Sequence, residues 1–374
     1  MYNKFMKKLA IIGGGIIGMT LANYIDTEQF EVILFDSGKN QATGASAGII
    51  SPWLSKRRNK KWYALARDGA AFFDKLVTDF ELDASVYEKS GTLFLRDSES
   101  LKELEQLAIE RKLDAPEIGE IRLLRAEETT EKLPLLKPAE SLYISGGARL
   151  DGKAYLKHLR ARAEQRGVQI ITDVAHIKKQ ETSWRVTAGQ EAYLVDELVL
   201  APGPALKNLL EQIGYITNVS PQKGQLLSFE TKLETGKWPV AFLEGEADLI
   251  PFQDGRLLLG ATHENDGGWD LAPTKEAFEQ LTKGVKLFLK DETFLNSSYE
   301  YRVGTRAYTP DFSPFFGPID TEKGLLVASG LGSSGLTTGP YIAYLLAEYL
   351  NNSKSKWEMG HYEKKIEEYI TREK

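Results

Sequence analysis

The feature that most constrains the fold of this 374-residue chain is a glycine-rich loop near its N-terminus. The β-rich run KLAII leads into Gly13-x-Gly15-x-x-Gly18, a helical stretch, and a second β-rich run, EVILFD, that ends at Asp36. In such a unit the first glycine permits a tight turn, the second lets a pyrophosphate approach the backbone, and the third allows close helix–strand packing. Asp36 is placed to accept hydrogen bonds from an adenosine ribose. The unit predicts a dinucleotide-binding, Rossmann-like domain and leaves the choice between NAD and FAD open.

A second glycine-rich loop, Ser329–Gly335, follows an apolar run and opens a helical stretch near the C-terminus. A helix N-terminus carries a partial positive charge and unpaired backbone N–H groups, so it stabilises an anion placed against it. An NAD enzyme has little use for a second such helix, whereas a reduced flavin ring carries negative charge at N1 and O2. The pair of loops therefore favours FAD.

Composition excludes several other kinds of site. The chain has no cysteine, which rules out disulfides, iron–sulfur clusters and a flavin tethered through sulfur, so we expect noncovalent FAD. With only four histidines, we expect no metal site. A formal net charge of −6 argues against a nucleic-acid partner. No apolar run reaches the roughly 18 residues of a membrane helix, and we expect a cytoplasmic protein.

Periodicity and turn residues divide the chain into helical and β-rich stretches. Helices are expected over 61–82, 98–113, 152–166, 274–289 and after Gly335, and β-rich runs over 168–177, 183–189, 192–203 and much of 221–309. Because nucleotide-type units lie near both ends of the chain, we expect an α/β fold with a discontinuous FAD-binding domain. Its expected segments are 1–84, 146–217 and 308–374. The intervening segments, 85–145 and 218–307, are expected to form a β-rich α+β substrate domain.

Further short motifs follow one another in a specific order along nearly the whole chain. They are GGGIIG at 13–18, Asp36, ASAGIISP at 45–52, GARLD at 147–151, Val174, APG at 201–203, PQKGQ at 221–225, GAT at 260–262, RVGTR at 302–306, TPD at 309–311, and the C-terminal loop with Thr337 and Pro340. This ordered set resembles the FAD-dependent amine oxidoreductases, which include D-amino-acid oxidase, glycine oxidase and sarcosine oxidase.

The resemblance implies a role for each matched segment. The 45–50 loop would run along the flavin, Val174 would lie on the adenine side, and the 330–337 loop would close over the isoalloxazine. The glycine-rich loops and the resemblance together give these candidate FAD-binding residues: Gly13, Gly14, Gly15, Ile16, Ile17, Gly18, Asp36, Ser37, Ser46, Ala47, Gly48, Ile49, Val174, Ala201, Gly203, Gly330, Gly332, Ser333, Ser334, Gly335, Leu336 and Thr337.

On the substrate side, the resemblance assigns the carboxylate of an amino acid to Arg306. Arginine suits this role because its planar guanidinium can hold both oxygens of a carboxylate. Arg302 has the same parity in EYRVGTRAY, so an unbroken strand would present both arginines on one face. A surface ion pair is the alternative for each. His263 continues the parity of the run before it and borders the expected pocket, with a packed or solvated histidine as the alternative.

The basic run at 56–61 follows the expected flavin loop. It forms either a solvated surface or a segment from which Arg57 or Arg58 reaches the substrate carboxylate or the flavin. Trp53 packs either on the flavin or in the core.

Three features depart from the family's pattern. Ala307 stands where proline is common, and Leu331 and Ser333 stand where several relatives have arginine or histidine. Asp248 aligns roughly with a tyrosine that glycine-oxidase-like members place above the flavin. The identity of the substrate therefore does not carry over from the family.

These features favour an FAD-dependent enzyme that oxidises the C–N bond of an amino acid (a D-amino acid, glycine or an N-alkyl amino acid). A hydride would pass to flavin N5, the imine product would hydrolyse, and the electron acceptor would be O2 or another redox carrier. Two alternatives stay open: an NAD-dependent dehydrogenase, for which we find no poised acid–base residue, and a non-catalytic FAD-binding subunit or sensor.

Overall fold

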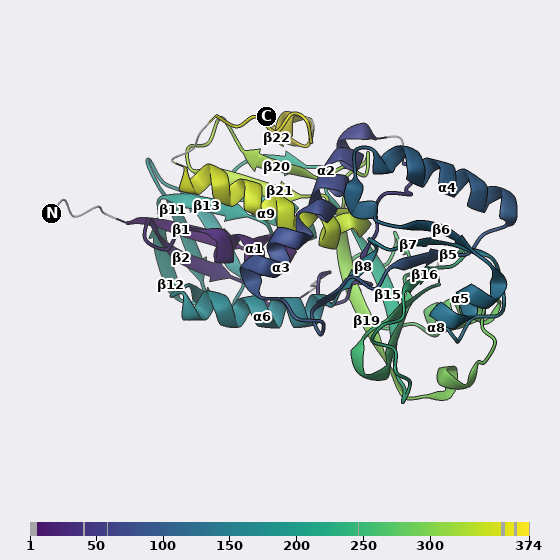
Figure 1. Ribbon diagram of the computed structural model, residues 1–374. Coiled ribbons are helices and arrows are strands. Elements are labelled where there is room, and N and C mark those ends of the chain that lie inside the picture. Colours follow the sequence, from purple (N-terminus) through teal and green to yellow (C-terminus); the bar gives the residue numbers. More distant parts are fainter. Residues whose placement is uncertain are drawn as a thin grey trace.

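A computed structural model describes residues 6–39, 42–57, 59–245, 247–352, 356–362 and 365–373 of the chain. It shows two lobes, each built around one large sheet, with the long strands β15 (Ser220–Glu230) and β19 (Tyr299–Tyr308) between them (Figure 1).

The first lobe is organised by a six-stranded sheet with the order β20-β21-β13-β1-β2-β9. All neighbours pair in parallel except β20, which is antiparallel to β21. The strands are β1 Lys7–Ile12, β2 Phe30–Phe35, β9 Gln169–Ile171, β13 Glu197–Leu200, β20 Phe315–Pro318 and β21 Leu325–Ser329.

Alternate residues of these strands face two separate cores, because successive side chains in a strand point to opposite faces. Leu9 and Ile11 of β1 join a core with the helices α1 (Ile16–Tyr24), α6 (Gly152–Gln165) and α9 (Gly335–Asn351). Ala10 and Ile12 face a second core. That core is closed by a three-stranded antiparallel sheet: β10 Ala175–Lys179, β11 Trp184–Ala188 and β12 Glu191–Val195. The parallel sheet is thus covered on both faces, as such sheets require.

The second lobe contains an eight-stranded sheet with the order β19-β15-β18-β17-β16-β5-β7-β6. Its remaining strands are β5 Thr92–Phe94, β6 Ile121–Leu124, β7 Ser141–Ile144, β16 Val240–Phe242, β17 Asp248–Pro251 and β18 Arg256–Gly260. Strands β15 and β19 pair antiparallel over their length, with Gln222 opposite Arg306 and Leu226 opposite Arg302. This register decides which side chains line the site.

The other described elements are short strands and connecting helices. They are β3 Ile49–Ile50, β4 Tyr87–Glu88, β8 Ala148–Leu150, β14 Tyr215–Thr217, β22 Ile370–Arg372, α2 Lys60–Ala71, α3 Phe73–Phe80, α4 Ser98–Lys112, α5 Ala126–Lys132, α7 Leu206–Glu211 and α8 Lys275–Lys286.

The mixed α/β class expected from the sequence is confirmed, and two local predictions were wrong. The β-rich run 168–177 is two strands in different sheets: β9 pairs with β2, and β10 pairs with β11. The run 192–203 divides in the same way between β12 and β13. Apolar content predicts strand but cannot show a change of partner, which occurs here at Asp173 and Asp196. Each carboxylate accepts a hydrogen bond from a backbone N–H at that point, from Val174 and Lys8 respectively.

Two predicted elements also end sooner than expected. The helix expected over 61–82 is α2 followed by α3, separated at Phe72, whose dihedral angles are still helical. Strand β18 stops at Gly260. The parity argument for His263 therefore fails, because the strand does not reach that residue.

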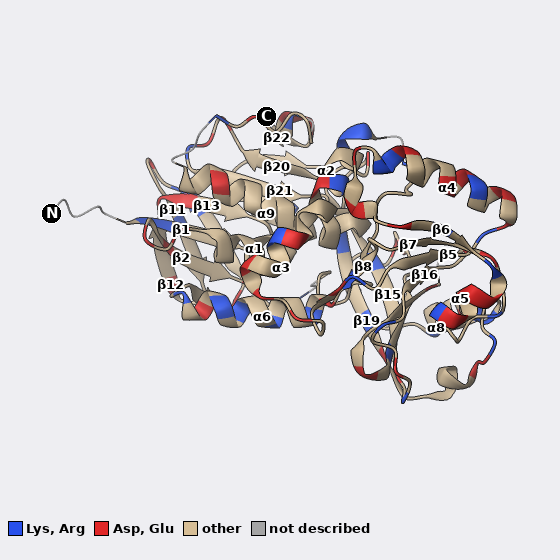
Figure 2. Cartoon of the chain, viewed as in Figure 1, with Lys and Arg blue, Asp and Glu red and all other residues tan. Residues whose placement is uncertain are grey.

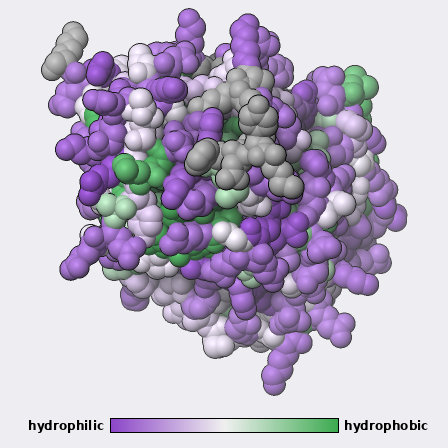
Figure 3. Space-filling model, turned by 90° about the vertical axis from the view of Figure 1, so that its left-hand side faces the viewer, coloured by the Kyte–Doolittle hydropathy of each residue, from purple (hydrophilic) through white to green (hydrophobic). Residues whose placement is uncertain are grey.

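Charged residues are frequent in helices such as α4 and α6, while the central strands carry few (Figure 2). The face of the molecule shown in Figure 3 is largely hydrophilic, and many of its apolar side chains lie in one recess. Among the described residues, no helix is both long and apolar enough to span a bilayer.

The two large sheets draw their strands from the two sets of segments expected for the two domains. We keep the division into an FAD-binding and a substrate domain, with the boundaries given above, as a proposal.

Candidate active site

A partly open cavity of about 680 Å³ is lined by residues of both lobes. One wall consists of the residues that follow the carboxyl ends of β1, β2, β13 and β21: Gly13, Asp36, Ala201 and Gly330. Ligands of open parallel sheets bind at this edge. The opposite wall is a face of the eight-stranded sheet and includes Arg306.

The first glycine-rich loop fits a pyrophosphate. Gly14 packs so closely that an added Cβ would lie 2.6 Å from Oδ2 of Asp36. Gly15 is the N-cap of α1 and supplies no capping side chain, and the first turn of the helix carries no acidic residue. The N–H of Ile16 donates to Oγ1 of Thr43 at 3.0 Å. A helix N-terminus that opens into a cavity and has no capping side chain of its own is suited to a phosphate anion.

The structure brings almost all the candidate FAD-binding residues to this one cavity, including Val174 from the segment between β9 and β10. Gly18 is the exception, because it does not line the cavity. Its added Cβ would lie 1.8 Å from the carbonyl oxygen of Gly13, so its position requires glycine for helix–strand packing. Gly18 therefore has a packing role and makes no direct contact with the ligand space.

The second glycine-rich loop lines the cavity and is held in place by several hydrogen bonds. It passes through a short turn at Gly332–Ser334 into α9, which has no capping side chain. Trp62 of α2 donates from its indole N–H to Oγ of Ser334 at 3.0 Å. Ser329 donates to the carbonyl of Gly203 at 2.9 Å, which ties the ends of β21 and β13 together. A second uncapped helix N-terminus therefore points at the same ligand space.

The expected flavin loop is held in place by β8. Gly48 has φ of +84°, and a Cβ there would lie 2.2 Å from the carbonyl oxygen of Leu150. The N–H of Leu150 donates to the carbonyl of Gly48 at 2.8 Å, and Ile49 pairs with Arg149. This docking presents Ser46, Ala47 and Gly48 to the cavity.

Arg306 lies on the sheet wall of the cavity with its guanidinium folded across β15. Its Nη1 donates to the carbonyl of Thr262 at 2.9 Å and to Oε1 of Gln222 at 3.2 Å. The guanidinium lies directly over Gly224, where an added Cβ would be 2.6–2.7 Å from its atoms. Any larger residue at 224 would displace the arginine, so the glycine of PQKGQ makes room for it.

The other predicted substrate-side residues differ in position. His263 lines the cavity and is exposed. Arg302 shares the strand face of Arg306 but is 3% exposed and does not line the cavity. Burial lowers the pKa of Arg302, which lies within electrostatic range of Asp151 and Arg256. Arg302 is therefore not positioned to bind substrate.

The basic run contributes one described residue to the cavity. Arg57 lines its mouth, donates to Oγ of Ser333 at 3.2 Å and lies 4.6 Å from the ring centroid of Trp62. Arg58 lies outside the described residues. Trp53 is 2% exposed and donates to Glu117 at 3.2 Å, so it fills the core.

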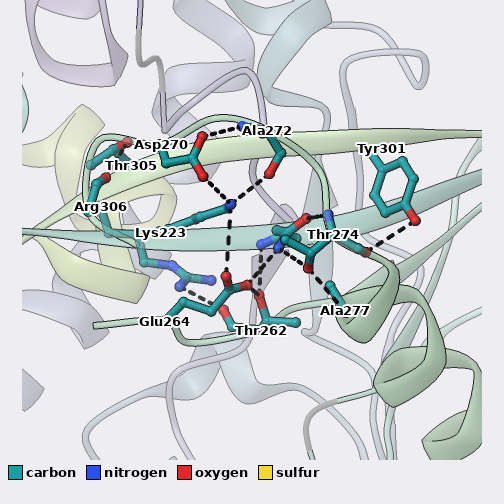
Figure 4. A network of polar contacts seen from close by, with 12 residues as sticks. Lys223, Thr262, Glu264, Asp270, Ala272, Thr274, Ala277, Tyr301, Thr305 and Arg306 are labelled. Atoms are coloured by element: carbon teal, nitrogen blue, oxygen red, sulfur yellow. Dashed lines mark hydrogen bonds and ion pairs between the residues drawn. The ribbon is translucent and has the colours of Figure 1, made fainter. Parts of the chain in front are cut away.

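A polar network on the opposite face of β15 fixes the segment 262–274, which contains His263 and Trp269 (Figure 4). The ammonium of Lys223 donates to the carbonyl of Ala272 at 2.6 Å and lies 3.7 Å from Asp270 and 4.0 Å from Glu264. Lys223 is 2% exposed. The Lys223 side chain thus ties a cavity-lining segment to the sheet.

Sequence reasoning missed several residues of the cavity wall. Asp248 of β17 and Phe242 of β16 line it, as do Trp269, Thr43 and Trp62. Asp248 was noticed only as a departure from the family's pattern. Its place became visible through the sheet register, in which it pairs with Gly260 of β18.

Burial raises the pKa of Asp248 to about 7. Its Oδ1 accepts a hydrogen bond from the N–H of Leu243 at 3.0 Å, and the more distant Arg96 acts on it electrostatically. The cavity thus has an arginine and a carboxyl group at separate places on one wall.

The sequence profile of the family described as FAD dependent oxidoreductase (DAO) matches residues 8–349. The chain belongs to this FAD-dependent oxidoreductase family. The match covers both large sheets and both glycine-rich loops, and FAD is the cofactor of this family. As a member of this family, the protein is an FAD-dependent oxidoreductase.

Similar proteins cover nearly the full length of the chain. An uncharacterised oxidoreductase, YurR of Bacillus subtilis (strain 168), is 34% identical over 96% of this chain and 98% of its own. Glycine oxidase of Pseudomonas putida is 27% identical over 93% of this chain and 95% of its own. The crystal structure of iminodiacetate oxidase from Chelativorans sp. BNC1 matches with a TM-score of 0.87 and 28% identity, covering 95% of this chain and 98% of that one.

Proposed function

We propose that this DAO-family oxidoreductase oxidises the C–N bond of an α-amino acid, either a primary amine or an N-alkyl amine, and that Arg306 holds the carboxylate of the substrate. The observation that carries the proposal is the guanidinium of Arg306 on the cavity wall, fixed over Gly224 by Thr262 and Gln222. The relatives support it, since glycine and iminodiacetate both carry a carboxylate beside the amine.

The residues of the chain supply position and shelter for this reaction. Bound FAD supplies the acceptor for a hydride from the carbon that bears the amine. Arg306 restricts the orientation of the substrate, because a carboxylate held by a planar guanidinium cannot rotate freely. Trp269 and Phe242 add apolar surface to the cavity that limits water around the reacting carbon. We propose that FAD is bound without a covalent link, as expected for a chain without cysteine.

Substitution of Arg306 tests the proposal. Arg306→Ala removes the charge and the fork, a loss on the order of 3–5 kcal/mol for a desolvated carboxylate. We expect kcat/KM for an amino-acid substrate to fall by several hundredfold or more, with Arg306→Lys intermediate because it keeps the charge alone. FAD content should stay near one per chain.

The control is the matching amine without a carboxylate, for which the two enzymes should have equal kcat/KM. An equal loss on both substrates would show that Arg306 is structural. If kcat/KM falls for neither substrate, another residue binds the carboxylate, which would contradict the proposal.

A further inference from the structure

Asp248 is an unusual residue for the wall of an amino-acid site. It lies on β17 at the end that faces the cavity and is only partly exposed. Within the described part of the chain, its one hydrogen bond is the 3.0 Å contact from the N–H of Leu243, and it forms no ion pair. A carboxylate placed there without a counter-ion would repel the carboxylate of a substrate unless the two groups are kept apart.

The nearest candidate counter-ion inside the protein is committed elsewhere. Arg96 acts on Asp248 electrostatically. Its Nη1, however, donates to the carbonyls of Leu95 and Phe242 at 2.6 and 3.0 Å. The cavity side of Asp248 is bordered by Phe242, which stacks on Phe94 with ring centroids 4.6 Å apart. A ligand that meets Asp248 therefore meets a carboxyl group beside an aromatic ring, a combination that attracts a cation.

The sheet register sets the spacing between Asp248 and Arg306. Asp248 pairs with Gly260, and Gly260 pairs with Leu226, so these three residues form one row across β17, β18 and β15. The guanidinium of Arg306 lies over Gly224, two residues along β15 from that row. With strands roughly 4.8 Å apart and a rise of about 3.4 Å per residue, the Cα atoms of Gly224 and Asp248 are roughly 12 Å apart.

This spacing excludes a single α-amino acid head group as the ligand of both residues. From this distance we subtract the length of the aspartate side chain and one contact distance at each end of the ligand. Roughly 5–7 Å then remain between a bound carboxylate carbon and a bound nitrogen. The α-nitrogen of an amino acid lies only about 2.5 Å from its carboxylate carbon. An ω-ammonium separated from the carboxylate by three or four methylene groups lies about 5–6 Å away, since each bond of about 1.5 Å advances the chain by about 1.25 Å.

We propose that Asp248 determines specificity by binding a second, distal ammonium group of the substrate, so that the enzyme acts on diamino acids or amino acids with a basic side chain. This inference rests on the proposed function, because Arg306 must hold the carboxylate at the other end. The ammonium forms a charge-assisted hydrogen bond with the carboxylate of Asp248 and lies against Phe242.

The competing role for Asp248 is structural, because its contact with Leu243 closes the turn between β16 and β17. Asp248→Asn separates the two roles. The amide oxygen of asparagine still accepts the hydrogen bond from Leu243, while the negative charge is gone. Asp266→Asn is the matched control, since Asp266 is exposed on the neighbouring segment and does not line the cavity.

The test is binding of two ligands that lack an α-amine, pentanoate and 5-aminopentanoate, to the FAD-loaded protein at pH 8 by calorimetry. The ligands differ only in the ammonium. The wild-type protein and Asp266→Asn should bind 5-aminopentanoate at least tenfold more tightly than pentanoate, as expected for one charge-assisted hydrogen bond. Asp248→Asn should bind both with equal affinity.

Equal affinities in the wild-type protein, or a preference that survives in Asp248→Asn, would overturn the assignment and leave Asp248 as a turn-forming residue. The arm with Arg306→Ala tests the proposed function separately, because it should weaken both ligands alike. An absent ammonium preference in the wild-type protein, with pentanoate still weakened by Arg306→Ala, contradicts the role of Asp248 alone. Unchanged pentanoate binding in Arg306→Ala contradicts the carboxylate site.

Turnover provides a second readout. Ornithine and norvaline differ chiefly in the terminal ammonium, and kcat/KM should favour ornithine in the wild-type protein by tenfold or more. Asp248→Asn should remove that difference through KM. A wild-type preference for norvaline would contradict the proposal.

Discussion

Asp248 illustrates how a single residue in a binding site costs stability. Its carboxyl group is mostly removed from water and lacks an ion-pair partner among the described residues, so burial raises its pKa to about 7. The unfolded chain ionises at an ordinary pKa of about 3.9. The fold therefore favours the neutral form, and ionisation stabilises the unfolded chain as pH rises between these two values.

Comparison of Asp248→Asn with the wild-type protein isolates this effect. Asparagine resembles the neutral acid, so the free energies of unfolding should be similar at low pH and diverge as pH rises, levelling off above about 7. Because Asp248 keeps partial contact with solvent, we expect less than the full effect of the pKa difference. Between pH 5 and pH 8, the free energy of unfolding of the variant should rise by about 2 kcal/mol relative to that of the wild type. Urea unfolding of the FAD-saturated proteins, followed by circular dichroism, measures this difference in the free energy of unfolding. A constant difference across this range would show that Asp248 is ionised throughout.

Asp36 makes a prediction about the cofactor. It lines the cavity at the end of β2, where its carboxylate is placed to accept hydrogen bonds from a ribose. Each charge-assisted bond is worth about 1.5–3 kcal/mol before water compensates. FAD affinity of Asp36→Ala should fall at least tenfold while the fold persists. Unchanged affinity in a fluorescence titration would mean that the ribose is held by other residues.

At this scale, the sequence predicted residues carried by contiguous motifs. Asp36 was predicted from a local pattern and Arg306 from the family resemblance, and both residues line the cavity. Asp248 and Phe242 did not, because they belong to the cavity only through pairing between strands that are distant in the chain. For Arg302, parity correctly predicted the strand face that it shares with Arg306, but parity could not show that Arg302 is buried away from the cavity.

At the scale of the elements, the position of the segment 262–274 depends on the side chain of Lys223. Lys223 projects from β15 on the face opposite Gly224 and meets Ala272, Asp270 and Glu264. The N–H of Ala272 and then the nearby ammonium lower the pKa of Asp270. The segment supplies His263 and Trp269 to the cavity. A less firmly held segment would therefore change the wall proposed for the substrate and leave the wall proposed for FAD intact.

Lys223→Met keeps the volume and removes the charge and its hydrogen bond. We expect a loss of about 1–2 kcal/mol in unfolding free energy and a several-fold rise in KM, with FAD affinity unchanged. Lys275→Met is the control, because Lys275 pairs with Glu279 on an exposed helix face and its removal should change the free energy of unfolding little. Equal KM values for the two variants would show that Lys223 does not position the segment.

Helices with a capping residue were predicted to within a residue or two at their start. Asp97, Asp151 and Thr274 each accept a backbone N–H at the N-terminus of α4, α6 and α8. Strands were predicted less well, because composition identifies β structure but does not assign it to a sheet. The pairs β9–β10 and β12–β13 each continue one apolar run into a different sheet.

At the scale of the whole molecule, the site is assembled from both sheets. The wall proposed for FAD comes from strand ends of the six-stranded sheet, and the wall proposed for the substrate comes from β15, β17 and β19 of the other sheet. Motif order along the chain was enough to predict the α/β class and the cofactor. The distance between Arg306 and Asp248 was not predictable, because it depends on the strand order β19-β15-β18-β17.

The central claim is that one cavity holds FAD and an amino acid whose carboxylate lies on Arg306. The most direct measurement is anaerobic mixing of the purified, yellow protein with a panel of amino acids, while the absorbance of the oxidised flavin is followed. We predict that an amino acid bleaches the wild-type flavin, that Arg306→Ala slows this bleaching by several hundredfold, and that the decarboxylated amine bleaches both proteins equally slowly. A protein that is colourless and does not take up FAD, or a flavin that no amino acid bleaches, would contradict the account.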